Sequence, residues 1–311
     1  MNTHATLSDR RLRAWAILAR AALTESTAAR ALAAARVAGP GIEDAADRIA
    51  ALTGGSGSTV AVADLAARDL DRADQAGAWL LTREDPGWTG LGLHDLDRSE
   101  GSAAPVAVWV RGTVEAVSVL TRVGVVGSRA VSTRGARITG EIAGALAARG
   151  VHIVSGGAFG VDVFAHRAAL DHGVATTLVS AAGIDRVYPA AHAEVFDAVA
   201  ASGAVVSEYP PGFGVDRTRL LARNRLVAAM SRQLVIPEAG IRSGTLSTAR
   251  WAHRLHRPVL AVPGPGATSS GCDRLIADGH ARPVHSVTDV LTALDETADP
   301  EPLRHRGPAV L

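Results

Sequence analysis

Residues 125–135, VVGSRAVSTRG, combine the residue types that proteins use to bind phosphate. An apolar run ends in a glycine, a short loop with Ser, Arg and Thr follows, and then a helical pattern begins. Glycine lets the backbone approach an anion, a helix N-terminus offers free N–H groups, and arginine offers a planar pair of donors. The alternative is a plain strand-to-helix turn that a hydroxyl side chain caps. The predicted phosphate-binding residues here are Gly127, Ser128, Arg129, Thr133 and Gly135.

A second glycine-rich loop, SGGAFG, covers residues 155–160 and follows another apolar run. It nearly fits a dinucleotide fingerprint, but serine takes the first glycine position. Such a site also needs an acidic residue about 20 positions further on, at the end of the next strand. That strand ends in VSAA at 179–182. We therefore expect no bound cofactor, and we assign Ser155, Gly156 and Gly157 to the same phosphate site.

The segment RTRLLARNRLVAAMSR, residues 217–232, is the most basic part of the chain. A row of arginines can follow several phosphates of a nucleic acid backbone, whereas one small substrate needs fewer. The alternative is a solvated helix start. The loop at 237–249, PEAGIRSGTLSTA, is a second candidate anion site because it also leads from a strand to a helix. From these two segments we select Arg217, Arg223, Asn224, Arg225, Ser243, Gly244 and Thr245.

Other reactive residue types indicate structural roles. Asp162 and His166 are four residues apart and share a helix face, but no nucleophile stands at a fixed spacing from them. We therefore predict capping and hydrogen bonding in place of catalysis. Cys272 is the only cysteine, which excludes an internal disulfide and a cysteine-built zinc site. We expect no metal and read Cys272 as structural.

Short runs rich in Val, Ile, Leu and Ala must position these loops. Runs of this kind are typical of strands that are buried on both faces of a parallel sheet, and helical patterns fill the gaps between them. The sequence thus predicts a doubly wound α/β sheet, whose ligands lie at the carboxyl ends of the strands. The predicted strands cover residues 122–127, 151–155, 175–180, 204–208, 233–237 and 258–262, with earlier strands near 79–81 and 106–112.

The chain of 311 residues is long enough for one large or two modest domains, and 47% of it is hydrophobic. Residues 1–70 predict a small helical domain, and Gly and Ser gather at 54–58 as a linker. Residues 71–290 form the α/β domain, and 291–311 are expected to be a tail. No uncharged apolar run approaches the roughly 20 residues that span a bilayer, so we expect no membrane contact and a cytoplasmic location.

Charge is unevenly distributed along the chain. From Arg122 to His285 there are 18 arginines and 11 acidic residues, whereas the rest of the chain has an acidic excess. Because no lysine is present, arginine abundance partly reflects genomic composition. Its concentration in the middle nevertheless favours a polyanionic partner.

Seven motifs in this order resemble the DNA-processing protein A family (DprA, also called Smf). They are VVGSR..ST.G at 125–135, VSGGAFGVD..AHRAAL at 154–170, G.D..YP..H at 183–192, SEYPPG at 207–212, RNRLVAAMS at 223–231, EAG.RSGTL.TA at 238–249 and AVPGP....GCDRLI at 261–276. The resemblance implies an extended Rossmann-like fold after a small helical domain of SAM-like or similar type. It also implies a homodimer that binds single-stranded DNA and helps load the RecA recombinase in natural transformation and recombination, without catalysis. The implied DNA pocket lies around Gly127, Ser128 and Arg129, beside the RNR segment.

The chain departs from the family at three places. Phe159 stands where the family often has arginine, and Leu220-Leu221 stand where it often has Phe-Pro. The chain also ends before the C-terminal winged helix of some members, so we expect none. Two alternatives of the same fold superfamily are a nucleoside-monophosphate phosphoribohydrolase and a nucleotide-sensing domain. Thr248 stands where the hydrolase motif has its catalytic glutamate, and threonine cannot serve as a general acid or base at neutral pH.

Overall fold

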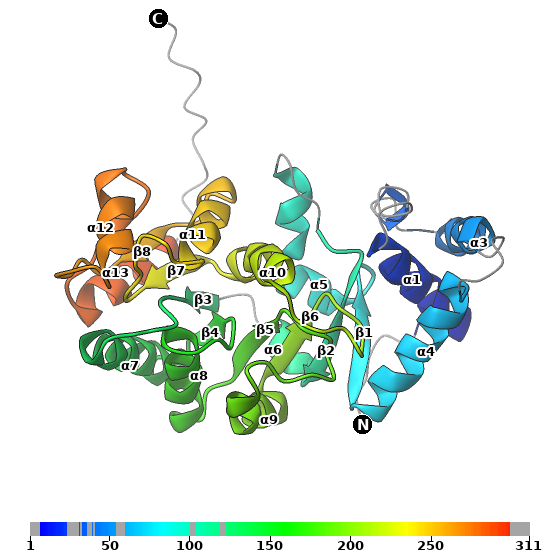
Figure 1. Cartoon of the computed structure of the whole chain (residues 1–311), viewed down its shortest axis with the longest axis horizontal. Helices are drawn as coiled ribbons and strands as arrows, with labels where there is room; N and C mark the ends of the chain where they lie inside the picture. The colour runs from blue at the N-terminus through cyan, green and yellow to red at the C-terminus, as the bar shows by residue number, and fades with distance from the viewer. Residues whose placement is uncertain are drawn as a thin grey trace, which may run out of the picture.

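The described part of the chain forms one nine-stranded sheet with helices on both faces and a helical layer at one end (Figure 1). The fold comes from a computed structural model, which describes residues 7–23, 31, 33–35, 39, 41–53, 60–99, 104–118 and 122–298. The strands are β1 (Ala78–Thr82), β2 (Ala107–Gly112), β3 (Arg122–Val125), β4 (His152–Ser155), β5 (Thr176–Ser180), β6 (Ala204–Ser207), β7 (Gln233–Ile236), β8 (Val259–Ala261) and β9 (Arg282–Pro283).

Seven strands run parallel in the order β6-β5-β4-β3-β7-β8-β9, and β2 and β1 continue the sheet beyond β6 as antiparallel partners. All six predicted central strands are present, each within two residues of its predicted bounds, and the two earlier strands are confirmed as β1 and β2. The two-residue edge strand β9 was not predicted, because so short a run has no pattern.

The chain winds outward from β3 in both directions, first through β4, β5 and β6 and later through β7, β8 and β9. The loops after β3 and β7 therefore leave the middle of the sheet side by side. Such a switch point is where doubly wound sheets bind ligands.

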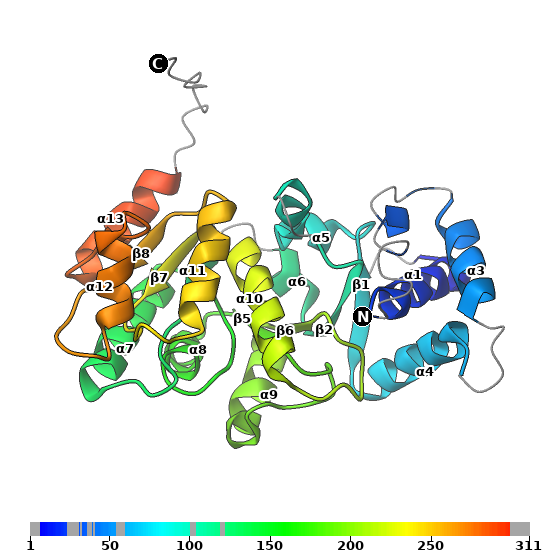
Figure 2. The ribbon, with the colours of Figure 1, turned by 45° about the horizontal axis from the view of Figure 1, so that its top comes forward.

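Helices cover both faces of the sheet, as Figure 2 shows from a second direction. One hydrophobic cluster holds β3 and β7 side chains such as Val125 and Val235 against α7, α8 and α13. Val126 and Ile236, the next residues of the two segments, belong to the cluster with α10, α11 and α12. Alternate residues thus pack on opposite faces, which explains the continuous apolar runs. These helices are α7 (Thr133–Ala148), α8 (Val161–Asp171), α9 (Ala193–Ser202), α10 (Arg217–Met230), α11 (Thr245–Arg254), α12 (Ser270–Ala277) and α13 (Val287–Ala298).

The N-terminal helices pack on the β1 end of the sheet. Trp15 and Leu18 of α1 share a hydrophobic cluster with Leu80 of β1 and Trp109 of β2. The predicted boundary at 70/71 falls inside α4, and the helical part shares a hydrophobic cluster with the β1 end of the sheet. The elements of this part are α1 (Asp9–Ala22), α3 (Ile42–Thr53) and α4 (Val62–Gln75), and further along come α5 (Pro86–Gly90), η1 (Leu93–Arg98), α6 (Val114–Ser118) and η2 (Ala190–His192).

The C-terminal part of the chain differs from the expected tail. Helix α13 runs to Ala298, and Val290, Ala293 and Leu294 are buried against α7 and β8. Their three- and four-residue spacing forms an apolar helix face, which makes 291–298 part of the folded domain. The rest of the expected tail, 299–311, and the whole of the expected linker, 54–58, lie outside the described residues. No helix in the described part of the chain is both long and apolar enough to cross a membrane.

Candidate functional site

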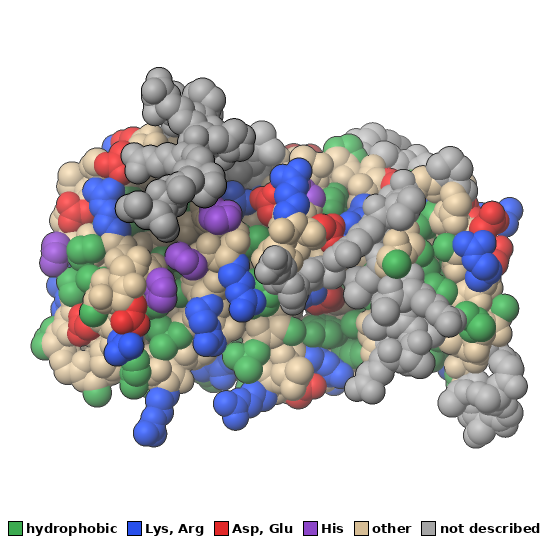
Figure 3. Space-filling view, turned by 90° about the horizontal axis from the view of Figure 1, so that it is seen from above, with side chains coloured by type: hydrophobic (Ala, Val, Ile, Leu, Met, Phe, Trp, Pro, Cys, Tyr) green, Lys and Arg blue, Asp and Glu red, His purple; other side chains and the backbone are tan. Residues whose placement is uncertain are grey.

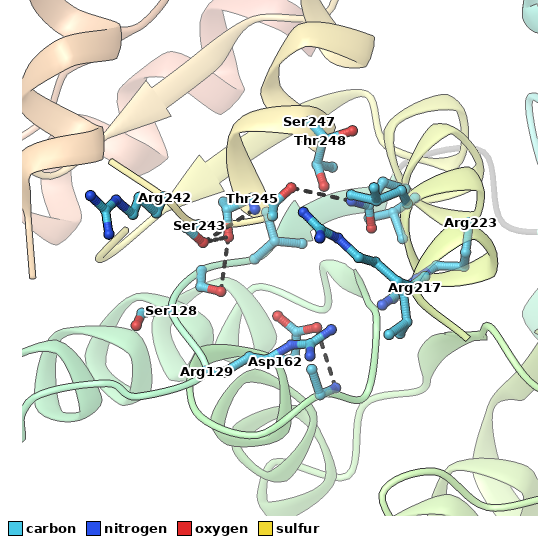
Figure 4. Close-up of a pocket in the computed structure, with 18 of the residues that line it drawn as sticks. Ser128, Arg129, Asp162, Arg217, Arg223, Arg242, Ser243, Thr245, Ser247 and Thr248 are labelled. Carbon is cyan, nitrogen blue, oxygen red and sulfur yellow. Dashed lines mark hydrogen bonds between the residues drawn. The ribbon is translucent and has the colours of Figure 1, made fainter. Parts of the chain in front are cut away.

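A cavity of about 840 Å³ opens at the carboxyl ends of β3 and β7, at the switch point of the sheet. Three segments form it. The loop after β3 brings Ser128 and Arg129, helix α10 brings Arg217 and Arg223, and the loop after β7 brings Ser243 and Thr245. Figure 4 shows these side chains converging from the three directions. The sheet topology therefore joins the loop after β3 to two segments that lie about a hundred residues further along the sequence.

Backbone contacts fix the loop after β3. The Ser128 N–H donates to the Glu238 carbonyl at 2.8 Å, and the Val161 N–H donates to the Ser128 carbonyl at 3.1 Å. Gly160 has a φ of +76°, and any Cβ at that position would collide with the Ser128 and Arg129 carbonyls. Glycine is thus needed at 160 so that the Ser128–Arg129 backbone can lie against the start of α8.

The floor of the pocket holds a buried cation. One Arg223 Nη donates to the Val179 carbonyl at 3.1 Å, and the guanidinium lies so close to Gly156 that a Cβ there would overlap it. Burial raises the pKa of the Asp162 carboxyl, and the Arg223 guanidinium opposes that rise. Burial lowers the Arg223 pKa, and the Asp162 charge opposes that change in turn. The two groups therefore stabilise each other's charged form beneath the cavity.

Three polar side chains along the wall already have partners within the chain, namely those of Ser243, Thr245 and Asn224. The Ser243 Oγ donates to the Thr245 Oγ1 at 2.8 Å, which donates to the Gly127 carbonyl at 2.9 Å. The Asn224 Nδ2 donates to the Gly244 carbonyl at 3.2 Å. These bonds tie α10 and the loop after β7 to the loop after β3. They indicate that Asn224 and Thr245 shape the pocket wall.

Four exposed arginines surround the cavity, namely Arg129, Arg217, Arg242 and Arg250. Within the described part of the chain, none of the four forms an ion pair with a carboxylate. Arg242 and Arg217 stand at opposite ends of the pocket in Figure 4. Arginine side chains also lie beside hydrophobic ones in the middle of the face in Figure 3. The pocket is thus an elongated cationic groove that can contact more than one anion.

Ten of the predicted residues lie at this site. Nine line the main cavity, namely Gly127, Ser128, Arg129, Arg217, Arg223, Asn224, Ser243, Gly244 and Thr245. Gly156 lines a small cleft that adjoins it. The other five predicted residues, Thr133, Gly135, Ser155, Gly157 and Arg225, line neither space.

The start of α7 is the main difference from the sequence expectation. The Glu238 carboxylate, which is buried, accepts from the Ser132 N–H at 2.8 Å and from the Ser132 Oγ at 2.5 Å. Gly135 packs directly against that carboxylate. The Glu238 carboxylate therefore occupies the N-terminus of α7, where the sequence predicted a bound phosphate. The Gly135 N–H donates to the Ser132 Oγ of this cap at 3.0 Å, and neither Gly135 nor Thr133 lines the pocket.

The remaining three displaced residues have structural contacts. The Ser155 Oγ donates to the Val125 carbonyl at 2.6 Å, which joins β4 to β3. Gly157 packs on Leu178 with a φ of +70°. Both Nη atoms of Arg225 bond the Glu208 carboxylate, at 2.6 and 2.8 Å. A step of two residues along a helix rotates the side chain by about 200° around the helix axis. Arg225 therefore points away from the pocket, because Arg223 faces it.

Sequence reasoning did not select Arg242, Ser247 and Arg250, which line the cavity. Arg242 could have been found, because it lies in the same strand-end loop as Ser243. Ser247 and Arg250 are three residues apart, so they share one face of α11 with Gly244. That face could be recognised only once Thr245 was known to begin the helix.

The two carboxylates that line the pocket, and the nearby His166, are held in structural hydrogen bonds. Asp162 Oδ2 accepts from the Ala158 N–H at 3.3 Å, and Asp216 Oδ1 caps α10 by accepting from the Arg219 N–H at 2.8 Å. His166 is buried and bonds the Thr176 hydroxyl at 2.9 Å, in keeping with the structural role predicted for it. Thr248 lines the wall.

The chain is similar to known proteins over most of its length. The family profile described as DNA recombination-mediator protein A matches residues 79–295. A DprA protein of Mycobacterium tuberculosis is 40% identical over 286 residues, which are 87% of this chain and 72% of that protein. The DNA processing protein DprA of Streptococcus pneumoniae is 38% identical over 204 residues, 65% of this chain and 71% of that protein.

Two solved structures have the same fold. The DprA structure from Streptococcus pneumoniae superposes with a TM-score of 0.66 at 30% identity and covers 82% of both chains. A structure that describes the single-stranded DNA binding mode of DNA processing protein A from Helicobacter pylori has a TM-score of 0.60 at 30% identity, covering 65% of this chain and 92% of that one. The resemblance drawn from the seven motifs is confirmed: the chain belongs to the DNA recombination-mediator protein A family, DprA/Smf.

Proposed function

We propose that the chain binds single-stranded DNA, with the phosphates held in the groove between Arg242 and Arg217. The observation that carries this proposal is the set of four exposed pocket arginines that pair with no carboxylate of the described chain. Unpaired cations around an elongated cavity suit a polyanion better than a single phosphate group. The Helicobacter pylori relative, whose structure describes a single-stranded DNA binding mode, supports the same ligand.

Membership of the family supports a finer role. A recombination mediator acts by holding DNA for another protein, so we infer that this chain helps load a RecA recombinase onto incoming strands in natural transformation and recombination. It does so as a cytoplasmic homodimer, without a cofactor and without a catalytic step. Asp162 and Asp216, the two carboxylates that line the pocket, both accept backbone hydrogen bonds, which fits a binding role.

A salt series tests the DNA-binding proposal. For a single strand, the slope of log affinity against log salt is about −0.7 per phosphate contacted. We expect a steep slope for the wild type and a shallower one for the Arg129→Ala, Arg217→Ala, Arg242→Ala triple variant, with affinity lowered by roughly 100-fold at moderate salt. Arg149→Ala is the matched control, because it removes an exposed arginine that lies outside the pocket.

Competition with duplex DNA tests the strand preference. Unlabelled single strands should displace a bound labelled strand at lower concentration than duplex of the same length. Equal competition by duplex, or a triple variant with the wild-type slope, would refute the proposal. RecA loading is tested separately, by the rate of RecA filament formation on single strands with and without the protein, and the dimer by sedimentation.

A further inference from the structure

Exposed hydrophobic side chains gather at the mouth of the cationic groove. Tyr188 and Leu221 line the main cavity, Phe159 lines the adjoining cleft, and Ile241 precedes Arg242 in the loop after β7. These four are 41–51% exposed, and within the described part of the chain only two other large hydrophobic residues are equally exposed. Such a concentration of exposed apolar surface at one place marks a binding site.

Two aromatic rings flank the adjoining cleft. Phe159 is 48% exposed and Tyr188 is 42% exposed. The Phe159 ring contacts the ring of His192, with 4.7 Å between the centroids and 68° between the planes. His192 is buried and its Nδ1 lies 3.1 Å from the Gly157 carbonyl oxygen. Phe159 is thus held in place by a fixed neighbour while much of its surface stays open to a ligand.

The size of the cleft limits what it can hold. Its volume is about 20 Å³, which is room for about one water molecule. A planar ring cannot enter, so it would have to lie across the mouth, between Phe159 and Tyr188. Aromatic surfaces of this kind stack on nucleobases in proteins that bind single strands, and any base can occupy them because every base has a π-face.

Arg129 connects this aromatic surface with the phosphate groove. Its side chain lines both the main cavity and the adjoining cleft, as do Tyr188 and Leu220. A nucleotide whose phosphate contacts Arg129 therefore has its base within reach of the two rings. In a duplex the base faces are buried in the stack of paired bases, whereas in a single strand they are free to stack on a protein ring.

We propose that Phe159 and Tyr188 form a base-stacking platform, which binds an unpaired nucleobase next to the phosphate held by Arg129. This inference rests on the proposed function and adds a second contact to it. The arginines bind any polyanion, whereas the platform binds only a strand whose bases are exposed. The platform thus gives the groove its preference for single-stranded over double-stranded DNA.

The experiment compares a normal single strand with one that carries abasic sites through its centre. The variants are Phe159→Leu and Tyr188→Leu, alone and combined, because leucine keeps apolar bulk and removes the ring. We expect the combined variant to lose roughly tenfold or more in affinity for the normal strand, as for loss of a stacked base. Its affinity for the abasic strand and its salt slope should stay at wild-type values. A strand with 2-aminopurine should show fluorescence quenching on binding to the wild type and less quenching on binding to the variant.

Two controls make the result specific. Phe159→Tyr keeps a ring and should retain wild-type affinity, and Leu52→Ala removes an exposed apolar residue on α3, outside both spaces, and should change nothing. If the combined variant loses equal affinity for the normal and the abasic strand, or loses affinity for neither, the base-stacking platform is refuted. Phosphate binding by the arginines would not be affected by that result. A wild type that binds neither strand would overturn the proposed function itself.

Discussion

The Glu238 carboxylate lies on the N-terminus of α7, where it accepts from the N–H and from the hydroxyl of Ser132. Glu238 follows β7 and Ser132 follows β3, so this contact joins the two loops that form the pocket. A buried carboxylate at a helix N-terminus is stabilised by the free N–H groups and by the helix dipole. The pocket is therefore built around an internal anion, which shapes the site without facing the ligand.

Glu238→Ala should destabilise the protein by about 3 kcal/mol, because it leaves buried donors without an acceptor. Glu238→Gln keeps one acceptor and should cost about half as much. Urea unfolding followed by circular dichroism measures both changes. Glu141→Ala removes an exposed carboxylate of α7 and is the control. Wild-type stability of the alanine variant would show that the cap contributes nothing.

A second prediction separates the arginines of α10. The Arg225 guanidinium pairs with Glu208, with only 14% of the arginine side chain exposed. Arg225→Ala should therefore lower the free energy of unfolding by about 2–4 kcal/mol, because it leaves a carboxylate largely buried and unpaired. Its salt slope for single-stranded DNA should equal that of the wild type. A slope reduced as much as that of Arg217→Ala would mean that Arg225 also contacts phosphate.

The arginines of α10 show where sequence reasoning stopped. The row RTRLLARNR was expected to follow several phosphates of a nucleic acid backbone, yet Asp216 caps a helix that already begins at Arg217. Helical rotation then separates Arg223 from Arg225, and the half-buried Glu208 carboxylate pairs with Arg225. The strands were predictable because each one is a local apolar run. The position of the ligand loops was predictable because alternating strands and helices form a parallel sheet, whose ligands lie at the carboxyl ends of the strands. The partners of Arg225 and of Ser132 were not predictable, since Glu208 and Glu238 reach them only through tertiary packing.

Gly156 provides a test of the pocket floor. A Cβ at this position would overlap the Arg223 guanidinium, so Gly156→Ala must move Arg223 away from the Val179 carbonyl. We expect single-stranded DNA affinity to fall by roughly tenfold and stability by about 1–3 kcal/mol. Gly140→Ala is the matched control, because its Cβ meets nothing within 4 Å and it lies in α7. That variant should be as stable as the wild type or up to about 1 kcal/mol more stable. A Gly156→Ala variant with wild-type stability and wild-type DNA affinity would show that the Arg223 side chain can adopt another position without loss.

Two buried histidines should make the protein sensitive to acid. Burial lowers the pKa of His152 and of His166 to about 3. Thr176 Oγ1 donates to the Ile153 carbonyl and so accepts from Nδ1 of His166, whose Nε2 has no partner within the described residues. Protonation would place an unpaired N–H and a charge in the core.

Both histidines are neutral in the folded state, while the unfolded chain binds protons near pH 6.5. Stability is thus fully present above pH 6.5 and falls as pH decreases toward 3, by up to about 1.4 kcal/mol per pH unit for each histidine. His166→Asn should reduce the steepness of this fall, measured by urea unfolding between pH 7.5 and pH 4. The His172→Asn control changes an exposed histidine and should keep the wild-type steepness. Equal steepness in all three proteins would exclude this origin of acid sensitivity.

The N-terminal helices contact the segment that leads into α10. The Arg20 guanidinium lies 4.9 Å from the centre of the Phe213 ring and bonds Asp69 at 3.2 Å. On the same ring lies the guanidinium of Arg219, 5.1 Å from its centre, in the first turn of α10. This stack connects α1 with the helix that carries Arg217. The N-terminal helices therefore help to position one end of the cationic groove.

A double-mutant cycle tests that connection. Arg20→Ala and Phe213→Ala should each destabilise the protein, and the two changes should couple by about 0.5–2 kcal/mol, as expected for a cation over an aromatic ring. Phe213→Ala should also weaken single-stranded DNA binding severalfold, because the start of α10 loses its contact with α1. Phe213→Trp keeps the ring and should retain affinity. Additive stability changes, or Phe213→Ala with wild-type DNA affinity, would show that the helical part does not position the groove.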